Sequence, residues 1–335
     1  MRINHEVLCP LLAHVRYVIW AQMCAEDSEK SQLTPVPRSQ SSPTIGVSPK
    51  VRYCVITSVR DEEQYVLGTI DSVLNQSIRP LEWIIVDDGS TDATGAIIDQ
   101  YAQKYSWIRT LHRKNRGYRS TGGGVEAFLD AYPLLQSRDW EYLVNLDGDL
   151  TFAPDYFGRC FEYFHKTPQL GIGGGAIYAK MGERLQLEKA PSFHVRGATK
   201  IYRRECWEKL DGLLCGLGWD TVDEIKANQL GWITRTFPDL RLVHHRASGT
   251  VWGAWGNAVN DGEADYIVGY HPLFFCLKCA RHVFNFPYVI RSLGIAYGFL
   301  RGIVRRTPQI GDRELRAYVR NQQLRRLMGV SSIWK

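Results

Sequence analysis

The 335-residue sequence contains few cysteines and no long uninterrupted apolar segment. Eight cysteines are too sparse for the disulfide network of a secreted scaffold, so we expect a reduced, cytoplasmic protein. No run of 18 uncharged apolar residues occurs, which argues against a helix that spans a bilayer. The apolar patch at residues 15–23 lacks the basic start and the small-residue cleavage site of a signal peptide.

Several common binding motifs are also missing. Cys276 and Cys279 form a lone pair, and the second pair of ligands that a structural zinc site needs does not stand nearby. No Gly-x-Gly-x-x-Gly follows the first predicted strand, which disfavours a dinucleotide site. Without a nucleic-acid recognition motif, we expect no nucleic-acid partner.

The positive charge is concentrated at one end of the chain. The net charge is +6, yet residues 278–335 hold 12 Lys and Arg against 2 Asp and Glu, which leaves −4 for residues 1–277. Residues 288–304 have the pattern of an amphipathic helix. We therefore expect residues 266–335 to form a basic helical C-terminal region that contacts an anionic membrane surface. A helical hairpin with a solvated basic face is the alternative.

Short apolar runs alternate with amphipathic segments after residue 50. Residues 26–50 are rich in Ser, Pro, Thr and charge, so residues 1–50 are predicted to be a disordered or linker segment. Buried strands are predicted at 53–56, 83–86, 108–111 and 142–146, and helices at 62–76, 93–105 and 125–135. This alternation predicts an α/β fold with a mostly parallel sheet flanked by helices.

Two of the predicted strands end in acidic clusters, which should face one cleft at the carboxyl edge of the sheet. Asp147-Gly148-Asp149 offers two carboxylates, the ligands that suit Mg²⁺ or Mn²⁺ bound to a diphosphate. A solvated acidic turn is the alternative. Asp87-Asp88 can accept hydrogen bonds from a base or ribose, although Asp also favours turns for backbone reasons.

The ordered set of motifs at residues 57–63, 84–92, 115–117 and 147–149 resembles the family 2 glycosyltransferases, which have the GT-A nucleotide-sugar fold. The resemblance covers residues 51–269, and the part from Val195 to Pro272 is similar to bacterial exopolysaccharide-type enzymes. It implies a GT-A catalytic domain at 51–265, with a nucleotide-binding half (51–150) and an acceptor and catalytic half (151–265).

The resemblance also implies roles for individual residues. Thr57 would line the nucleotide pocket and Asp87 would contact the base. Asp147 would lie near the ribose and diphosphate, and Asp149 would ligate the metal. Arg119 could reach a phosphate.

A later motif suggests the catalytic base. Family members place an Asp eleven residues before a Gly and an aromatic residue, and Asp220 stands eleven residues before Gly231 and Trp232. An inverting transfer needs such a carboxylate to take the proton of the acceptor hydroxyl. Asp223 and Glu224 are the fallback candidates, and Asp220 could instead cap the helix at 222–230.

A histidine pair follows the strand-like residues 240–243. Family members often place a His here, near the metal, and imidazole is an acceptable ligand. The sequence does not choose between His244 and His245. A structural histidine pair at a strand end is the alternative.

The predicted activity is inverting transfer of one sugar from a nucleotide-diphosphate sugar, with UDP implied by the resemblance, to a hydroxyl of a lipid-linked or envelope glycan. Two other activities stay open. A sugar nucleotidyltransferase would need a basic phosphate loop after the first strand, where residues 57–63 carry three carboxylates. The other is a catalytically inactive carbohydrate-binding or scaffold subunit.

Overall fold

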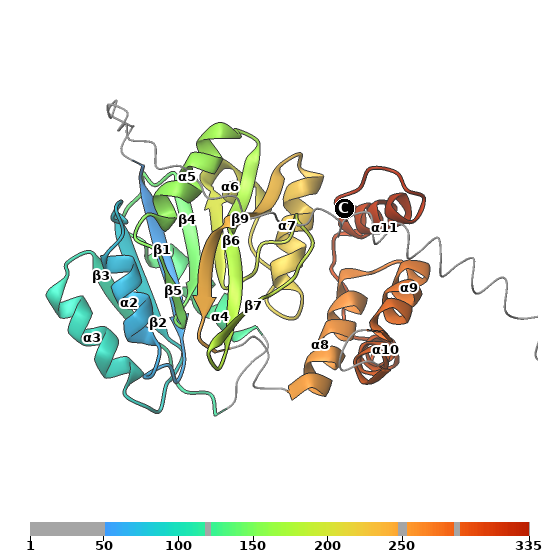
Figure 1. Ribbon diagram of the computed structural model, residues 1–335, viewed down its shortest axis with the longest axis horizontal. Coiled ribbons are helices and arrows are strands. Elements are labelled where there is room, and N and C mark those ends of the chain that lie inside the picture. Colours follow the sequence, from blue (N-terminus) through green and yellow to red (C-terminus); the bar gives the residue numbers. More distant parts are fainter. Residues whose placement is uncertain (1–50, 118–121, 247–252, 285–288, 335) are drawn as a thin grey trace, which may run out of the picture. The chain divides into compact units, whose positions relative to one another are not determined.

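The computed structural model describes residues 51–117, 122–246, 253–284 and 289–334 (Figure 1). The predicted linker, residues 1–50, and Arg119 lie outside the described residues. The strands are β1 (Tyr53–Val59), β2 (Glu82–Asp87), β3 (Ile108–His112), β4 (Tyr142–Asp147), β5 (Leu150–Phe152), β6 (Leu170–Met181), β7 (Arg184–Leu187), β8 (Thr199–Arg203) and β9 (Ile233–His244). The helices are α2 (Val66–Leu74), α3 (Thr94–Lys104), α4 (Gly123–Ala131), the short η1 (Tyr132–Leu134), α5 (Tyr156–Lys166), α6 (Arg204–Leu210), α7 (Trp219–Gln229), α8 (Gly253–Val268), α9 (Pro272–His282), α10 (Val289–Val304) and α11 (Arg313–Leu327).

The strands form one mixed sheet in the order β3-β2-β1-β4-β8-β6-β9-β5, with β7 paired to β6. The α/β class is confirmed, and β3-β2-β1-β4 is parallel as predicted. The rest is not a mostly parallel sheet: β8 runs antiparallel to β4 and β6, and β5 runs antiparallel to β9, while β6 and β9 are parallel. The sequence could not predict this half because an apolar run does not reveal the direction of its partner strand.

Two apolar layers cover the two faces of the sheet. In β1, Tyr53 and Val55 point to one layer, and Cys54 and Ile56 point to the other, because successive side chains of a strand face opposite sides. Side chains of α2, α3 and α5 complete the first layer, and side chains of α4 and α6 complete the second. The continuous apolar runs in the sequence reflect this burial on both faces.

Two predicted helices are shorter than expected. Helix α2 begins at Val66 rather than residue 62, because the chain before it turns through Asp61, whose φ is 52°. The helix predicted at 125–135 is α4, which ends at Ala131 and passes into η1. Pro133 lies at that transition, and a proline cannot donate the backbone hydrogen bond that would continue the helix.

The last four helices pack partly against the sheet domain and partly against each other. Leu315 and Val319 of α11 lie in an apolar cluster with Val222 and Ile225 of α7. Helix α8 crosses residue 265, where the sequence places the end of the catalytic domain. Within the described part of the chain, no helix is both long and apolar enough to cross a membrane.

Candidate active site

The acidic clusters lie at one edge of the sheet because β1, β2 and β4 end together. In the parallel pairings, Val59 stands opposite Asp87, and Ser58 stands opposite Asp147. The chain then turns sharply at Gly148, where an added Cβ would lie 2.4 Å from a methyl carbon of Val59. Only glycine fits that turn, which is why the two carboxylates of Asp147 and Asp149 are separated by this residue type.

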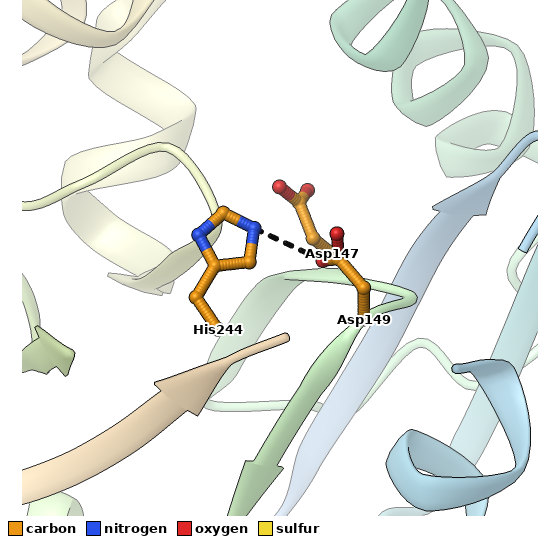
Figure 2. A group of neighbouring side chains, drawn as sticks. All are labelled: Asp147, Asp149 and His244. Atoms are coloured by element: carbon orange, nitrogen blue, oxygen red, sulfur yellow. Dashed lines mark ion pairs between the residues drawn. The ribbon is translucent and has the colours of Figure 1, made fainter. Parts of the chain in front are cut away.

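A histidine joins the two carboxylates from another part of the sheet. Strand β9 ends at His244, which pairs with Leu150 at the start of β5, one residue after Asp149. The His244 Nε2 lies 3.2 Å from Asp149 Oδ1, and one possible ligand atom of each of Asp147, Asp149 and His244 lies within 4.8 Å of the others (Figure 2). Two carboxylate oxygens and one imidazole nitrogen are a donor set that fits Mn²⁺ or Mg²⁺.

The electrostatics of this group favour a positive charge at its centre. Burial raises the pKa of Asp147 to about 7, and the neighbouring carboxylate of Asp149 adds to the effect. Burial opposes a charge on His244, but hydrogen bonds to Asp149 and Glu188 outweigh it and raise the pKa of His244 to about 10. The negative charge of the carboxylates thus favours binding of either protons or a cation. Without a cation, protons on Asp147 and His244 compensate this charge, and a bound divalent cation would compensate it instead.

Glu188 supports the imidazole from the opposite side. Its Oε1 lies 3.3 Å from the His244 Nδ1, so the Nε2 is left facing Asp149. Arg196 lies 3.5 Å from the other carboxylate oxygen of Glu188. Such a carboxylate behind a histidine commonly orients a metal ligand. Sequence reasoning missed Glu188, because it follows β7 and no motif surrounds it.

The second histidine of the pair points elsewhere. The Nε2 of His245 lies 2.8 Å from the Thr151 Oγ1, and its ring stacks on Tyr65 with a centroid distance of 6.2 Å. Of the two candidates that the sequence leaves open, the structure therefore brings only His244 to the carboxylates.

A cavity of about 300 Å³ opens beside the Asp147 carboxylate. Its lining residues come from β4, the loop before β8, the start of α4, the start of α7 and the ends of β6 and β9: Gly124, Val125, Asn145, Asp147, Ile177, Arg196, Gly197, Ala198, Trp219, Asp220 and His244. The stretch after Val195 enters this wall, and the Asn145 side chain donates to the carbonyl oxygen of Gly197 at 2.5 Å. The cavity therefore brings together the predicted base and the metal candidates.

Asp220 and Asp223 occupy different environments. Helix α7 is capped by Gly218, so Asp220 stands in the first turn and is not the N-cap, contrary to the structural alternative above. Asp220 is partly exposed and lines the cavity. Asp223 is buried, accepts hydrogen bonds from Lys200 at both of its carboxylate oxygens at 2.8 and 2.9 Å, and accepts another from Tyr202. Burial raises its pKa to about 6, which the charge of Lys200 opposes.

A histidine that is only 11% exposed at its side chain connects Asp220 to this charge cluster. The Nδ1 of His194 lies 2.9 Å from Glu224, and its Nε2 lies 3.8 Å from Asp220. Burial opposes a charge on His194, but the Glu224 carboxylate outweighs it and raises the pKa of His194. Glu224, the other fallback base, is fully buried between His194 and Lys200, so it does not reach the cavity. Sequence reasoning missed His194, which lies one residue before the part of the resemblance that begins at Val195.

The three candidate nucleotide residues make internal contacts at the ends of β1 and β2. The buried Thr57 hydroxyl accepts a hydrogen bond from Trp83 at 2.9 Å. Asp87 accepts from the Ser90 backbone and lies 3.1 Å from the His112 ring. Asp88 binds Arg113 and Arg116 at 2.6 and 3.0 Å. None of the three lines the cavity.

Comparison with known proteins decides the family. The model of Glycosyl transferase family 2 matches residues 54–213. Residues 54–213 are a family 2 glycosyltransferase segment. The family model covers β1 to α6, so Asp147 and Asp149 lie inside the matched glycosyltransferase segment, while Asp220 and His244 lie beyond it.

Curated relatives of this glycosyltransferase align with about half of the chain. The chain is 28% identical over 177 residues to the uncharacterized glycosyltransferase MG025 homolog of Mycoplasma pneumoniae. This alignment covers 49% of this chain and 57% of that protein. The chain is 27% identical over 182 residues to the polyprenol monophosphomannose synthase of Mycolicibacterium smegmatis. This alignment covers 49% of this chain and 66% of that protein. Less than two thirds of either relative is therefore aligned.

A solved structure resembles the glycosyltransferase over nearly its whole length. The mannosyltransferase PcManGT from Pyrobaculum calidifontis, in complex with GDP-Man and Mn²⁺, matches with a TM-score of 0.55 at 16% identity, covering 94% of this chain and 93% of that one. At this identity the likeness concerns the fold alone, and it confirms the predicted GT-A fold.

Proposed function

We propose that the protein is an inverting, metal-dependent glycosyltransferase that moves one sugar from a nucleotide-diphosphate sugar to a hydroxyl acceptor. The observation that carries the proposal is one cavity lined by Asp147, His244 and Asp220. A metal-ligand set on one side of a cavity and a partly exposed carboxylate on another are what such a transfer needs.

The donor set of Asp147, Asp149 and His244 would hold Mn²⁺ or Mg²⁺ in this proposal. When bound, the cation offsets the negative charge that develops on the leaving diphosphate. Glu188 keeps the His244 Nε2 directed at the carboxylates. The Mn²⁺ of the PcManGT complex supports a cation of this type.

Asp220 is the proposed catalytic base. The acceptor oxygen forms a bond to the anomeric carbon while its proton passes to the Asp220 carboxylate. The bond between that carbon and the diphosphate oxygen breaks on the opposite face, and its electron pair leaves with the diphosphate. Asp223 and Glu224 position α7 through Lys200 and His194, and they take no proton from the acceptor.

The nucleoside of the donor is proposed to be uridine because of the family resemblance. Thr57, Asp87, Asp88 and Arg119 are the proposed nucleotide-binding residues. The GDP-Man of the PcManGT complex makes guanosine the second candidate. A test with both nucleotides is therefore needed.

The acceptor is proposed to be a lipid-linked or envelope glycan, and the enzyme to work peripherally at the inner face of the cell membrane. The basic charge of residues 278–335 supports the membrane location. Single addition is proposed because the Gln-x-x-Arg-Trp motif of processive synthases is missing. A product that grows by many sugars per binding event would contradict this.

The nucleotidyltransferase alternative is less well supported. The loop after β1 would have to bind a triphosphate, yet it holds Asp61 and Glu63, which accept hydrogen bonds from the backbone of Thr91 and Ala93. These contacts order the turn after β2, and the one basic side chain of the loop, Arg60, lies 3.9 Å from the carboxylates of Asp61 and Asp88.

The test is release of a nucleoside diphosphate by the purified full chain from UDP-linked hexoses, UDP-linked N-acetylhexosamines and GDP-mannose. Each donor is assayed with Mn²⁺, Mg²⁺ or EDTA. We expect release from one donor that requires the metal, is lost in Asp149→Ala, and is retained in the matched control Asp71→Asn, an exposed carboxylate on α2.

Two outcomes contradict the proposal. If no donor is hydrolysed and none binds with metal dependence in calorimetry, the inactive scaffold replaces it. Formation of pyrophosphate from a nucleoside triphosphate and a sugar 1-phosphate would establish the nucleotidyltransferase.

A further inference from the structure

Helix α10 buries a face made mostly of small residues and exposes most of its large apolar ones. Gly294, Gly298 and Gly302 are buried, together with Ser292 and Ile295. The opposite face is formed by apolar side chains that are each about half exposed or more: Val289, Ile290, Leu293, Tyr297, Leu300, Ile303 and Val304. At 100° per residue these seven positions cover an arc of about 140°, the width of an ordinary core-facing stripe. The apolar stripe of α10 therefore faces away from the protein.

The glycines explain why α10 cannot rotate about its axis to bury its apolar stripe. An added Cβ at Gly298 would lie 2.0 Å from the carbonyl oxygen of Val259 in α8, and one at Gly262 of α8 would lie 1.9 Å from that of Ile295. The two backbones approach so closely that only glycine fits between them. This contact locks the orientation of α10 and leaves its apolar stripe outside.

The exposed stripe continues over neighbouring helices. Ten of the 21 large apolar side chains that are exposed in the described part of the chain lie between Leu273 and Val304. Leu273 and Leu277 belong to α9 and Phe284 follows it. Trp255 of α8 is 47% exposed, and its ring lies 6.1 Å from that of Tyr297. An exposed Trp and Tyr beside an aliphatic stripe is the composition that favours the interface between lipid and water.

Arginines lie around this apolar surface. Arg281, Arg305 and Arg306 are exposed, and none of them forms an ion pair with any carboxylate in the part of the chain that the structure covers. Arg291 lies 3.5 Å from Asp261 and Arg301 pairs with Glu263, both on the α8 side. The uncompensated positive charge near the stripe would attract an anionic surface.

We propose that the outer face of α9 and α10 docks flat on an anionic lipid bilayer, with the α10 stripe among the acyl chains and the arginines at the headgroups. The proposal deepens the membrane part of the proposed function, on which it rests, by naming the surface that binds. Since no described helix is long and apolar enough to cross a bilayer, the helices would lie in the interface.

The docking face is connected to the catalytic cavity. Gly218, which caps α7 just before Trp219 and Asp220, packs against Ala264 and Val268 of α8. Helix α8 in turn lies beside α10 (Figure 1), and the two helices touch at Gly262 and Gly298. A bilayer that binds α10 would therefore fix the distance and orientation of a lipid-linked hydroxyl relative to the proposed base, Asp220.

A second copy of the chain is the other possible occupant of this face. The side chains of Arg281, Arg305 and Arg306, unpaired within the described residues, would find anionic partners on a lipid surface, whereas a second copy would offer the same apolar stripe and the same positive charges. The charge distribution therefore favours anionic lipid over self-association.

The test is flotation of the full chain with vesicles of phosphatidylcholine alone or with 30% phosphatidylglycerol. We expect binding to the anionic vesicles that weakens as salt is added. Leu293→Gln with Leu300→Gln should lower the partition coefficient about tenfold or more, because two aliphatic side chains no longer insert. Arg305→Gln with Arg306→Gln should lower it about 25-fold on anionic vesicles and little on neutral ones.

The matched control is Leu67→Gln with Leu134→Gln, two exposed leucines of α2 and η1, and it should bind like the wild type. Because all these side chains are exposed, the variants should keep the wild-type melting temperature. Unchanged donor hydrolysis in solution would show that only docking is affected. If no variant hydrolyses a donor and the flotation pattern is still found, the proposed transfer fails and the docking face stands.

Three results would overturn the inference. The first is no binding of the wild type to anionic vesicles, and the second is binding that the α10 variant does not weaken. The third is a dimer in analytical ultracentrifugation that the Leu293→Gln, Leu300→Gln variant dissociates, which would make the stripe an interface between copies.

Discussion

At the scale of single residues, one turn of α7 separates two aspartates with different surroundings. Asp220 lines the cavity, whereas Asp223 is buried against Lys200. We expect Asp220→Asn to lower kcat about 10²- to 10⁴-fold, since proton transfer contributes that much, and to change the free energy of unfolding by less than about 1 kcal/mol. Asp223→Asn should instead destabilise the fold by about 3–5 kcal/mol because it leaves Lys200 with one partner fewer.

The rate of donor turnover in the presence of acceptor measures the effect of each variant on kcat. Urea unfolding of the same variants measures the effect on the free energy of unfolding. An active Asp220→Asn, or a fully stable Asp223→Asn without activity, would contradict the assignment of the base.

His194 offers a test of how the base is tuned. Its raised pKa keeps it protonated to higher pH than an ordinary histidine, which places a positive charge 3.8 Å from the Asp220 carboxylate. His194→Gln keeps a hydrogen-bonding side chain and removes the charge. We expect kcat/KM of the variant to fall below that of the wild type at pH values where His194 is protonated, and the difference to shrink as the pH rises through the pKa of His194.

The exposed His165 on α5 provides the control, since His165→Gln should leave the profile unchanged. A role of His194 in packing alone would lower kcat/KM by the same factor at every pH.

The spacing of residues predicted part of this chemistry. Asp147 and Asp149 are predictable because a glycine between two carboxylates at a strand end is a local pattern. Glu188 and His194 are not predictable, because they reach His244 and Asp220 only through the fold of segments more than 20 residues away in sequence. The choice of His244 over His245 likewise depends on the pairing of β9 with β5.

At the scale of elements, the contact of α8 with α10 depends on missing side chains. Gly262→Ala would place a Cβ 1.9 Å from the Ile295 carbonyl, so the helices must separate. We expect a loss of about 1–3 kcal/mol in the free energy of unfolding, as for other overpacked cores.

Thermal unfolding measures this loss, and Gly311→Ala is the matched control because an added Cβ there meets nothing within 4 Å. Equal melting temperatures for the two variants would contradict the close contact.

The elements themselves were predictable to different degrees. The four parallel strands and helix α10 follow from apolar runs and periodicity. The antiparallel strands β8 and β5 do not, because pairing direction depends on connections that the pattern does not contain. The short exposed strand β7 lacks an apolar run, so nothing in the sequence indicates it.

At the scale of the whole molecule, the proposed metal site joins the two parts of the sheet. Asp147 ends β4 in the parallel part, whereas His244 ends β9 in the mixed part. A cation held by both would bind only the folded arrangement, so it should stabilise the entire domain. At a hundredfold excess over its dissociation constant, the gain is about 2.7 kcal/mol.

Thermal unfolding with Mn²⁺ or EDTA measures this gain, and the adjacent histidines supply matched variants. We expect Mn²⁺ to raise the Tm of the wild type and of His245→Ala, whose side chain contacts Thr151, and to have no effect on His244→Ala. The reverse order would move the ligand to His245. A gain that all variants share would place the cation outside this site, because only binding through His244 links β9 to the carboxylates of the β4–β5 turn.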